Sequence, residues 1–138
     1  MKNYINLTIY SDKENVAFAR NCVALFCLRE NPTIDLLDDV KTIVSEAVTN
    51  CVVHAYTNNR GKIDIECRIE NGVLHIKVTD YGKGIFDIKK AVSPYYSSLD
   101  TERAGIGFTI MQSLCESFDV QNNENGGVTV CLSKKLFS

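Results

Sequence analysis

The residues with the clearest potential for chemistry are an acid and an amide, Glu46 and Asn50, in Ser45-Glu46-Ala47-Val48-Thr49-Asn50. A helix turns by about 100° per residue, so this spacing places the two side chains about 40° apart. A carboxylate held there can act as a general base, and an amide oxygen can ligate a divalent cation. Ordinary polar residues flanking an apolar helix face would give the same pattern, so this segment alone leaves both interpretations open.

The first of two glycine pairs lies in Asp80-Tyr81-Gly82-Lys83-Gly84-Ile85, directly after a predicted strand. Glycine tolerates unusual backbone angles and lets a flat ligand approach the main chain closely. A carboxylate at the end of a strand can accept a hydrogen bond from an exocyclic amine. The pattern fits a site for a nucleobase, and a plain turn remains the alternative.

The second glycine pair lies in Glu102-Arg103-Ala104-Gly105-Ile106-Gly107-Phe108. We expect Gly105 and Gly107 to open a helix, where free backbone amides attract anions. Arg103, just before them, can bind a phosphate through two parallel hydrogen bonds. A flexible helix start with a solvated arginine is the alternative.

Composition places the chain among globular domains. Its 138 residues suit one domain spanning 1–138, and a hydrophobic content of 45% argues against disorder. A formal charge of −2 argues against a nucleic-acid surface. There is no apolar run of membrane-spanning length and no secretory signal, so we expect a cytoplasmic protein without membrane contact. The six cysteines form no CxxC pair, and we expect reduced, buried thiols rather than disulfides or a zinc site.

Hydrophobic periodicity predicts five strands and three helices. Ser11 and Glu14 are expected to form a capping box, Thr33 to cap the second helix, and Asn71-Gly72 to form a hairpin turn. In chain order we expect a strand at 4–10, helices at 11–30 and 33–56, strands at 63–69 and 73–79, an irregular loop at 85–104, a helix at 105–116, and strands at 118–121 and 128–133. This order predicts an α/β (α+β) two-layer sandwich, in which three helices cover one face of a mostly antiparallel mixed sheet.

The second predicted helix positions the acid and the amide. Its apolar residues, including Val40, Val44 and Ala47, share one face, and Glu46 and Asn50 fall on the border of that face. Packing can hold the backbone of such a row rigid while its side chains stay reachable. His54 continues the row, either as a packed, hydrogen-bonded side chain or as a functional one.

The familiar nucleotide motifs are missing. There is no GxxxxGK[ST] loop, neither glycine pair extends to GxGxxG, and the HRD and DFG signatures of protein kinases are absent. The set Glu-x-x-x-Asn, Asp-x-Gly-x-Gly and Gly-x-Gly instead resembles the gyrase–Hsp90–histidine kinase–MutL (GHKL) ATPase superfamily with its Bergerat ATP-binding fold. Within it, the segments around Glu46 and Gly105 resemble the small anti-sigma serine kinases, and the length resembles their sporulation type.

This resemblance implies a role for each motif residue at the phosphate end. Asn50 would ligate Mg²⁺, Glu46 would be the general base, and Arg103 would reach the γ-phosphate of ATP. Gly105 and Gly107 would hold the phosphates. The segment 85–104 would form a lid over the nucleotide.

At the adenine end, the resemblance implies that Asp80 reads the amino group while Gly82 and Gly84 let the base lie against the backbone. Many relatives have Gly-Thr at the start of the last strand, where the threonine helps to fix the adenine. Here Gly127 precedes Val128, and Thr129 comes one place later. We assign Thr129 to the nucleotide site, although a shift of one residue on a strand points to the other face.

The function implied by the resemblance is that of a bifunctional regulator. It would bind and inhibit a sporulation sigma factor, and with Mg-ATP it would phosphorylate a serine of an anti-anti-sigma factor. ADP would also bind, and a homodimer is expected. The alternatives are a nucleotide-responsive sigma-binding module without kinase activity and a stand-alone GHKL ATPase. A detached histidine-kinase catalytic domain would need a phosphoacceptor helix, for which 138 residues leave no room.

Overall fold

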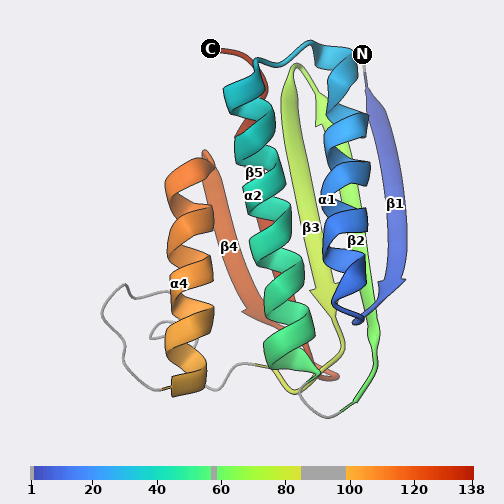
Figure 1. Cartoon of the computed structure of the whole chain (residues 1–138), viewed down its shortest axis with the longest axis vertical. Helices are drawn as coiled ribbons and strands as arrows, with labels where there is room; N and C mark the ends of the chain where they lie inside the picture. The colour runs from blue at the N-terminus through green and yellow to red at the C-terminus, as the bar shows by residue number, and fades with distance from the viewer. Residues whose placement is uncertain (1, 57–58, 85–98) are drawn as a thin grey trace.

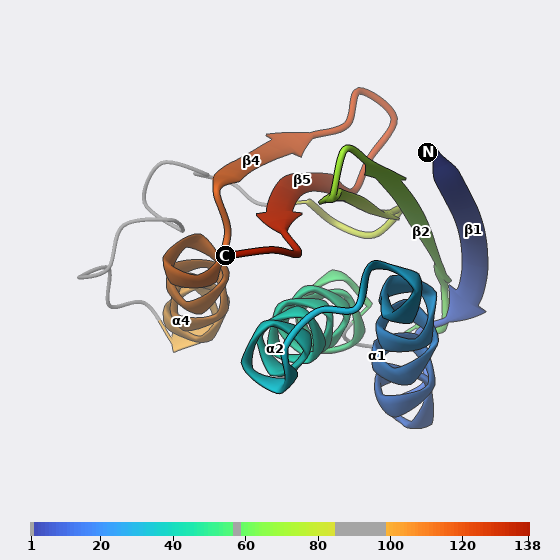
Figure 2. The same ribbon diagram turned by 90° about the horizontal axis from the view of Figure 1, so that it is seen from above.

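The protein folds into two layers, a curved antiparallel sheet and a layer of helices packed on one of its faces (Figures 1 and 2). The structure, a computed structural model, describes residues 2–56, 59–84 and 99–138, with the backbone alone for 99–104. The two-layer α/β architecture predicted from the sequence is confirmed. Among the described strands every pairing is antiparallel, where the sequence predicted a mostly antiparallel mixed sheet.

The sheet runs in the order β1-β2-β3-β5-β4 across the described residues. Its strands are β1 (Asn3–Tyr10), β2 (Lys62–Glu70), β3 (Val73–Asp80), β4 (Ser117–Asn122) and β5 (Val128–Lys135). Alternation of apolar and polar residues gives the sheet one buried face, as at Ile63, Ile65 and Ile69 of β2. The predicted Asn71-Gly72 hairpin is confirmed, with positive φ at both residues, as a type I′ turn requires.

The helical layer contains α1 (Glu14–Cys27), α2 (Ile34–Asn50) and α4 (Leu99–Leu114), with α2 in the middle (Figure 2). A short 3-10 turn, η1 (Leu28–Glu30), follows α1, and a π-helical turn, η2 (Cys51–Ala55), continues α2. The predicted core face of α2 is confirmed by the burial of Val40, Val44 and Ala47. Packing on the sheet therefore fixes the helix that carries Glu46 and Asn50.

The helix starts differ in part from the sequence predictions. Thr33 caps α2 as predicted, because its hydroxyl accepts a hydrogen bond from the Leu36 amide at 3.2 Å. The capping box at Ser11 and Glu14 is wrong, since α1 has Lys13 at its N-cap and no side-chain cap. The Ser11 hydroxyl instead accepts a hydrogen bond from the Gly61 amide at 3.0 Å, which ties the end of β1 to the approach of β2.

Helix α4 begins at Leu99, so the prediction that Gly105 opens this helix is wrong. The preceding Leu-Asp-Thr-Glu-Arg-Ala contains strong helix formers, and their propensity outweighs the cost of about 1 kcal/mol for a glycine inside a helix. Of the loop predicted over 85–104, residues 85–98 lie outside the described part of the chain.

The cysteines are free thiols, as predicted. Cys27, Cys51 and Cys67 are buried, whereas Cys131 is exposed on the outer face of β5 and corrects the expectation of general burial. No cluster of three or more potential metal ligands occurs among the described residues.

Candidate functional site

Glu46 and Asn50 lie directly against Gly107 of α4. A Cβ atom on Gly107 would come within 3.0 Å of Glu46 Oε2 and 3.1 Å of either polar atom of the Asn50 amide. Real Cβ atoms rarely approach neighbours this closely, so a glycine is what lets α4 lie against this row of α2. The first and third sequence motifs thus meet in space.

Asn50 has an unsatisfied polar atom. Its Nδ2 is buried and has no hydrogen-bond partner within the described structure. Leaving a buried donor unpaired costs about 1–3 kcal/mol, and such atoms are uncommon in native proteins. An orphaned amide next to a carboxylate marks a place where a ligand can supply the missing interactions.

Asp80, at the end of β3, is buried and held from two sides. Its Oδ1 accepts hydrogen bonds from the backbone amides of Gly82 and Val128, each at 3.1 Å. Its Oδ2 accepts one from the Cys51 thiol, with Sγ at 3.7 Å. Burial raises the pKa of Asp80, although these three hydrogen bonds oppose the shift. Oδ1 is therefore fixed by the backbone, while Oδ2 has one weak donor among the described residues.

The first glycine loop is anchored by the π-helical turn η2. A Cβ on Gly82 would lie 2.3 Å from the Ala55 carbonyl oxygen, and the Lys83 amide donates to that oxygen at 3.3 Å. Gly84 has a φ of +78°, which strongly favours glycine. Single π turns inside helices are often found at functional sites. Here the turn brings the end of the helical segment against the glycine loop.

Gly127, a glycine to which the sequence suggested no role, also supports Asp80. Gly127 has a φ of +94°, and a Cβ there would lie 2.0 Å from the Asp80 carbonyl oxygen. This close contact aligns the Val128 amide with the Asp80 carboxylate. The Gly126-Gly127 pair before a predicted strand was the available signal.

A narrow cavity of about 40 Å³ joins these residues. Asn50, Cys51, Asp80 and Gly84 line it together with the apolar side chains of Ala47, Val78, Phe108, Val128 and Val130, and His54 and Ala55 complete the lining. Ligand pockets usually hold about 300–1,000 Å³. The cavity therefore has the lining of a ligand site but must widen before a nucleotide can enter.

Other predicted site residues are not brought into this cavity. Thr129 faces the opposite side of β5 from Val128 and Val130, and its hydroxyl donates to Asn123 Oδ1 at 2.7 Å. Gly105 and Gly107 lie beyond the first four residues of α4, so their amides belong to the helical hydrogen-bond ladder rather than being free. The side chain of Arg103 lies outside the described residues, and so do residues 85–98 of the lid predicted over 85–104.

The residues present can hold a Mg²⁺ ion only when a bound nucleotide supplies further ligands. Asn50 offers one amide oxygen, and Glu46 lies on the preceding turn against the same glycine. Mg²⁺ typically binds one or two protein oxygens and takes its other ligands from phosphates and water. The orphaned Asn50 Nδ2 is a hydrogen-bond donor, so the partner it calls for is an acceptor such as a phosphate oxygen and not the cation.

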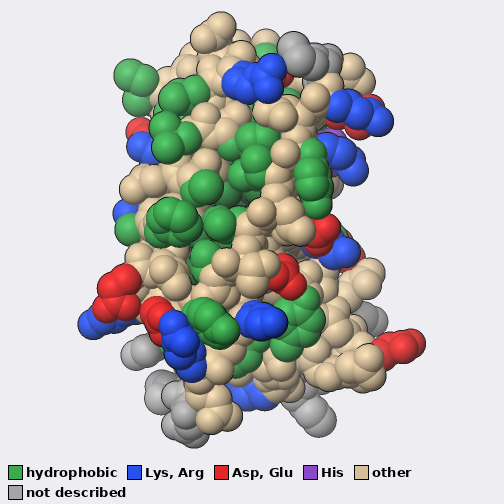
Figure 3. Space-filling view, turned by 90° about the vertical axis from the view of Figure 1, so that its right-hand side faces the viewer, with side chains coloured by type: hydrophobic (Ala, Val, Ile, Leu, Met, Phe, Trp, Pro, Cys, Tyr) green, Lys and Arg blue, Asp and Glu red, His purple; other side chains and the backbone are tan. Residues whose placement is uncertain are grey.

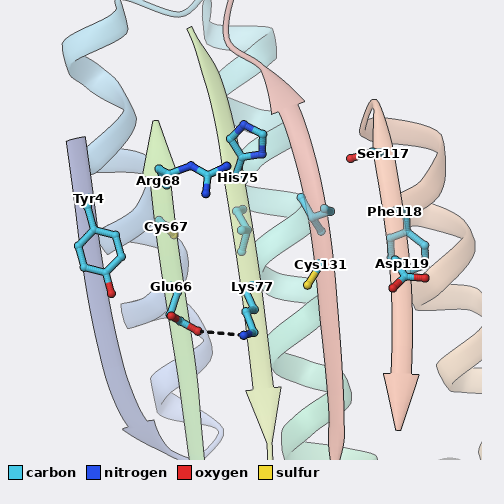
Figure 4. A pocket seen from close by; sticks show the side chains of 12 residues that line it. Tyr4, Glu66, Cys67, Arg68, His75, Lys77, Ser117, Phe118, Asp119 and Cys131 are labelled. Atoms are coloured by element: carbon cyan, nitrogen blue, oxygen red, sulfur yellow. Dashed lines mark ion pairs between the residues drawn. The ribbon is translucent and has the colours of Figure 1, made fainter. Parts of the chain in front are cut away.

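A second hollow, of about 420 Å³, lies on the outer face of the sheet (Figure 4). Tyr4, Arg68, His75 and Asp119 contribute to its lining, and Glu66 and Lys77 form an ion pair of 3.8 Å within it. None of the predicted site residues lines this hollow. Apart from Thr129, the site candidates whose side chains are described therefore lie on the helix-covered face.

Comparison with known proteins identifies the fold and the family of this chain. Residues 9–134 match the family described as Histidine kinase-like ATPase domain. The catalytic domain of the histidine kinase ThkA, solved in a nucleotide-free form, superposes with a TM-score of 0.61 at 19% identity over 99% of both chains. The fold and site thus define a domain of the histidine kinase-like ATPase class.

Relatives of known name narrow the family further. The chain is 46% identical over 137 residues to an anti-sigma F factor of Clostridium botulinum (strain Eklund 17B / Type B), covering 98% of this chain and 96% of that protein. It is 42% identical to those of Thermoanaerobacter sp. (strain X514) and Geobacillus kaustophilus (strain HTA426), over 99% of this chain and 96% and 94% of theirs. The chain belongs to the anti-sigma F factor family. No helix in the described part of the chain has the length and apolar character needed to cross a membrane.

Proposed function

We propose that this chain is a cytoplasmic anti-sigma factor and serine protein kinase, acting as a single domain over residues 1–138. It binds and inhibits a sporulation sigma factor, and it uses Mg-ATP to phosphorylate a serine of an anti-anti-sigma factor. The observation that carries the proposal is the convergence of α2, β3 and α4 on one site, at Glu46, Asp80 and Gly107.

The adenine end of the site is the cavity beside Asp80. Because two amides hold Oδ1, Oδ2 is the oxygen left to accept the 6-amino group of adenine. Gly82 and Gly84 leave the adjoining backbone without side chains, and Val78, Phe108 and Val130 offer apolar surface to the ring. This combination of one polar contact and an apolar lining is typical of nucleobase sites.

The phosphate end is the row of Glu46 and Asn50 beneath Gly107. Binding a nucleotide here requires α4 to move away from this row, because the existing contacts leave no space. When its early turns unwind, the amides of Gly105 and Gly107 become available to phosphate oxygens, and Arg103 comes close to the γ-phosphate. Thr129, on the other face of β5, is not needed for this arrangement.

Phosphoryl transfer depends mainly on positioning and charge neutralisation. Asn50 would hold Mg²⁺, which when bound neutralises charge on the phosphates. Glu46 accepts the proton of the serine hydroxyl as that oxygen attacks the γ-phosphorus, and the bond between this phosphorus and the bridging oxygen breaks, so that ADP leaves. Its carboxylate is held on a rigid, packed helix, as a general base requires.

Apolar side chains gather at the surface on the side formed by α1 and β1 (Figure 3), and this side is our candidate for protein contacts. Phe18, Leu25 and Leu28 are large apolar side chains with 55%, 67% and 49% of their surface exposed. Gatherings of this kind mark contacts with other protein chains. This side can accommodate the sigma factor or the second subunit of a homodimer, and the nucleotide site lies elsewhere.

Incubation with labelled Mg-ATP and the anti-anti-sigma factor tests the kinase assignment. We expect label on a serine of the partner, and a rate at least about 100-fold lower with Glu46→Gln, because a general base typically contributes that factor or more. The matched control Glu124→Gln, in the exposed turn before β5, should keep the wild-type rate.

The alternatives give different results in the same assay. Label released only as free phosphate would identify a stand-alone ATPase. Capture of the sigma factor without any transfer of label would identify a nucleotide-responsive binding module. An unchanged transfer rate in Glu46→Gln would exclude Glu46 as the base.

A further inference from the structure

The adenine end of the cavity contains a polar group for which the proposed mechanism has no use, the thiol of Cys51. Cys51 follows Asn50 directly and is 5% exposed. Its Sγ lies 3.4 Å from the Ala47 carbonyl oxygen and 3.7 Å from Asp80 Oδ2. The thiol has a single proton, which can be donated to either oxygen; donated to Oδ2, it connects the helix that carries Glu46 and Asn50 to the carboxylate at the other end of the cavity.

The two oxygens of Asp80 are held unequally. Oδ1 accepts from two backbone amides, whereas Oδ2 accepts only from the Cys51 thiol among the described residues. The carboxylate turns about its Cβ–Cγ bond, so the amides on Oδ1 and the thiol on Oδ2 together fix its plane. The Cys51 thiol is the described side chain that donates to Oδ2.

Strand β5 supplies no side-chain donor that could replace this thiol. Val128 contributes its backbone amide to Oδ1 and an apolar side chain to the cavity. The Thr129 hydroxyl points to the other face and donates to Asn123. Holding Oδ2 therefore depends on η2 and not on β5.

The thiol acts as a donor and not as a nucleophile. An ordinary thiol is mostly protonated at neutral pH and is a weak hydrogen-bond donor, and the Asp80 carboxylate lies 3.7 Å from this Sγ. The hydrogen bond from Cys51 in turn lowers the pKa of Asp80, against the effect of burial. An ionised carboxylate accepts hydrogen bonds only, which suits an amino group and repels a ring carbonyl.

We propose that Cys51 is a positioning residue for base recognition. Its thiol holds Oδ2 of Asp80 towards the cavity as an acceptor, and it thereby sets the preference for adenine over a 6-oxo purine. The orphaned Nδ2 of Asn50, in the same cavity, is an independent sign that a ligand binds there. The inference rests on the proposed nucleotide function.

Calorimetric titration with ADP and with IDP, in the presence of Mg²⁺, tests this role. Cys51→Ala should weaken ADP binding about three- to tenfold, the value of one modest hydrogen bond, and leave IDP binding unchanged. Cys51→Ser should restore ADP affinity to within about twofold, because a hydroxyl donates to the same oxygen. The control Cys67→Ala removes an equally buried thiol from β2, far from the cavity lining, and should leave both affinities unchanged.

The outcomes distinguish the role of Cys51 from the proposed nucleotide binding. If Cys51→Ala weakens ADP and IDP equally, or changes neither, the positioning role is wrong while the nucleotide site stands. If the wild-type protein binds neither ADP nor ATP, both the site and the role of Cys51 are wrong. Thermal unfolding of each variant shows whether an altered affinity reflects loss of the fold.

Discussion

Replacing Asp80 by asparagine should reverse the base preference of this protein. The Gly82 and Val128 amides both donate to Oδ1, so the asparagine oxygen must occupy that position to keep these two bonds. The Nδ2 group then takes the place of Oδ2 and faces the cavity. A donor there opposes the adenine 6-amino group and suits the 6-oxo group of hypoxanthine.

The magnitude follows from the single hydrogen bond that changes. A hydrogen bond to a charged group contributes about 1.5–3 kcal/mol, so ADP affinity should fall about 10- to 150-fold. IDP gains a neutral hydrogen bond of about 0.5–1.5 kcal/mol, equivalent to an increase of about two- to tenfold. The ratio of the two dissociation constants should therefore invert.

Stability should change in the opposite direction to ADP affinity. The pKa of Asp80 is raised above 3.8, so the folded state binds its proton more tightly than the unfolded state does. Its ionised form therefore lowers the free energy of unfolding. This destabilisation is fully present at pH values above the raised pKa and is absent below pH 3.8. Asp80→Asn should be more stable than the wild type at pH 7, and this advantage should shrink as the pH falls towards 3.8.

Titration calorimetry with ADP and IDP, together with urea unfolding at several pH values, measures both effects. Asp119→Asn, which changes an exposed acid on the outer face of β4, is the matched control and should alter neither. Retention of ADP affinity within twofold in Asp80→Asn would refute the assignment of Asp80 as the adenine reader. A variant less stable than wild type at pH 7 would refute the argument from burial.

Two further predictions concern the fold around the site, and urea unfolding measures both. Gly127→Ala should lower the free energy of unfolding by about 3 kcal/mol, because its Cβ would lie 2.0 Å from the Asp80 carbonyl oxygen at a φ of +94°. Gly126→Ala, whose Cβ would have 3.4 Å of clearance, should lower it by only about 1–2 kcal/mol. Equal losses in the two variants would contradict the steric argument. Lys134→Met should lower the free energy of unfolding by about 1–3 kcal/mol, because the buried ammonium donates to Asp39 at 3.2 Å and to the Leu114 carbonyl at 2.6 Å. The exposed control Lys135→Met should leave the free energy of unfolding almost unchanged. Similar losses in the two variants would argue against a stabilising role for these buried contacts.

The sequence by itself determined the local parts of this protein. Period-two alternation defined the strands, Asn71-Gly72 defined a hairpin, and Thr33 marked the start of α2, because each depends on neighbours in the chain. Helical spacing likewise placed Glu46 and Asn50 together on the border of the packed face. The motif set was sufficient to indicate the family to which the comparisons assign the chain.

Only the tertiary structure decided how distant segments share a site. It put Gly107 against Glu46 and Asn50, made Gly127 and Val128 the supports of Asp80, and turned Thr129 away. Such contacts arise from packing between segments tens of residues apart, so no local pattern encodes them. The Cys51 thiol is the clearest case: in the sequence it is a small apolar-like residue after Asn50, and only the fold brings it to Asp80.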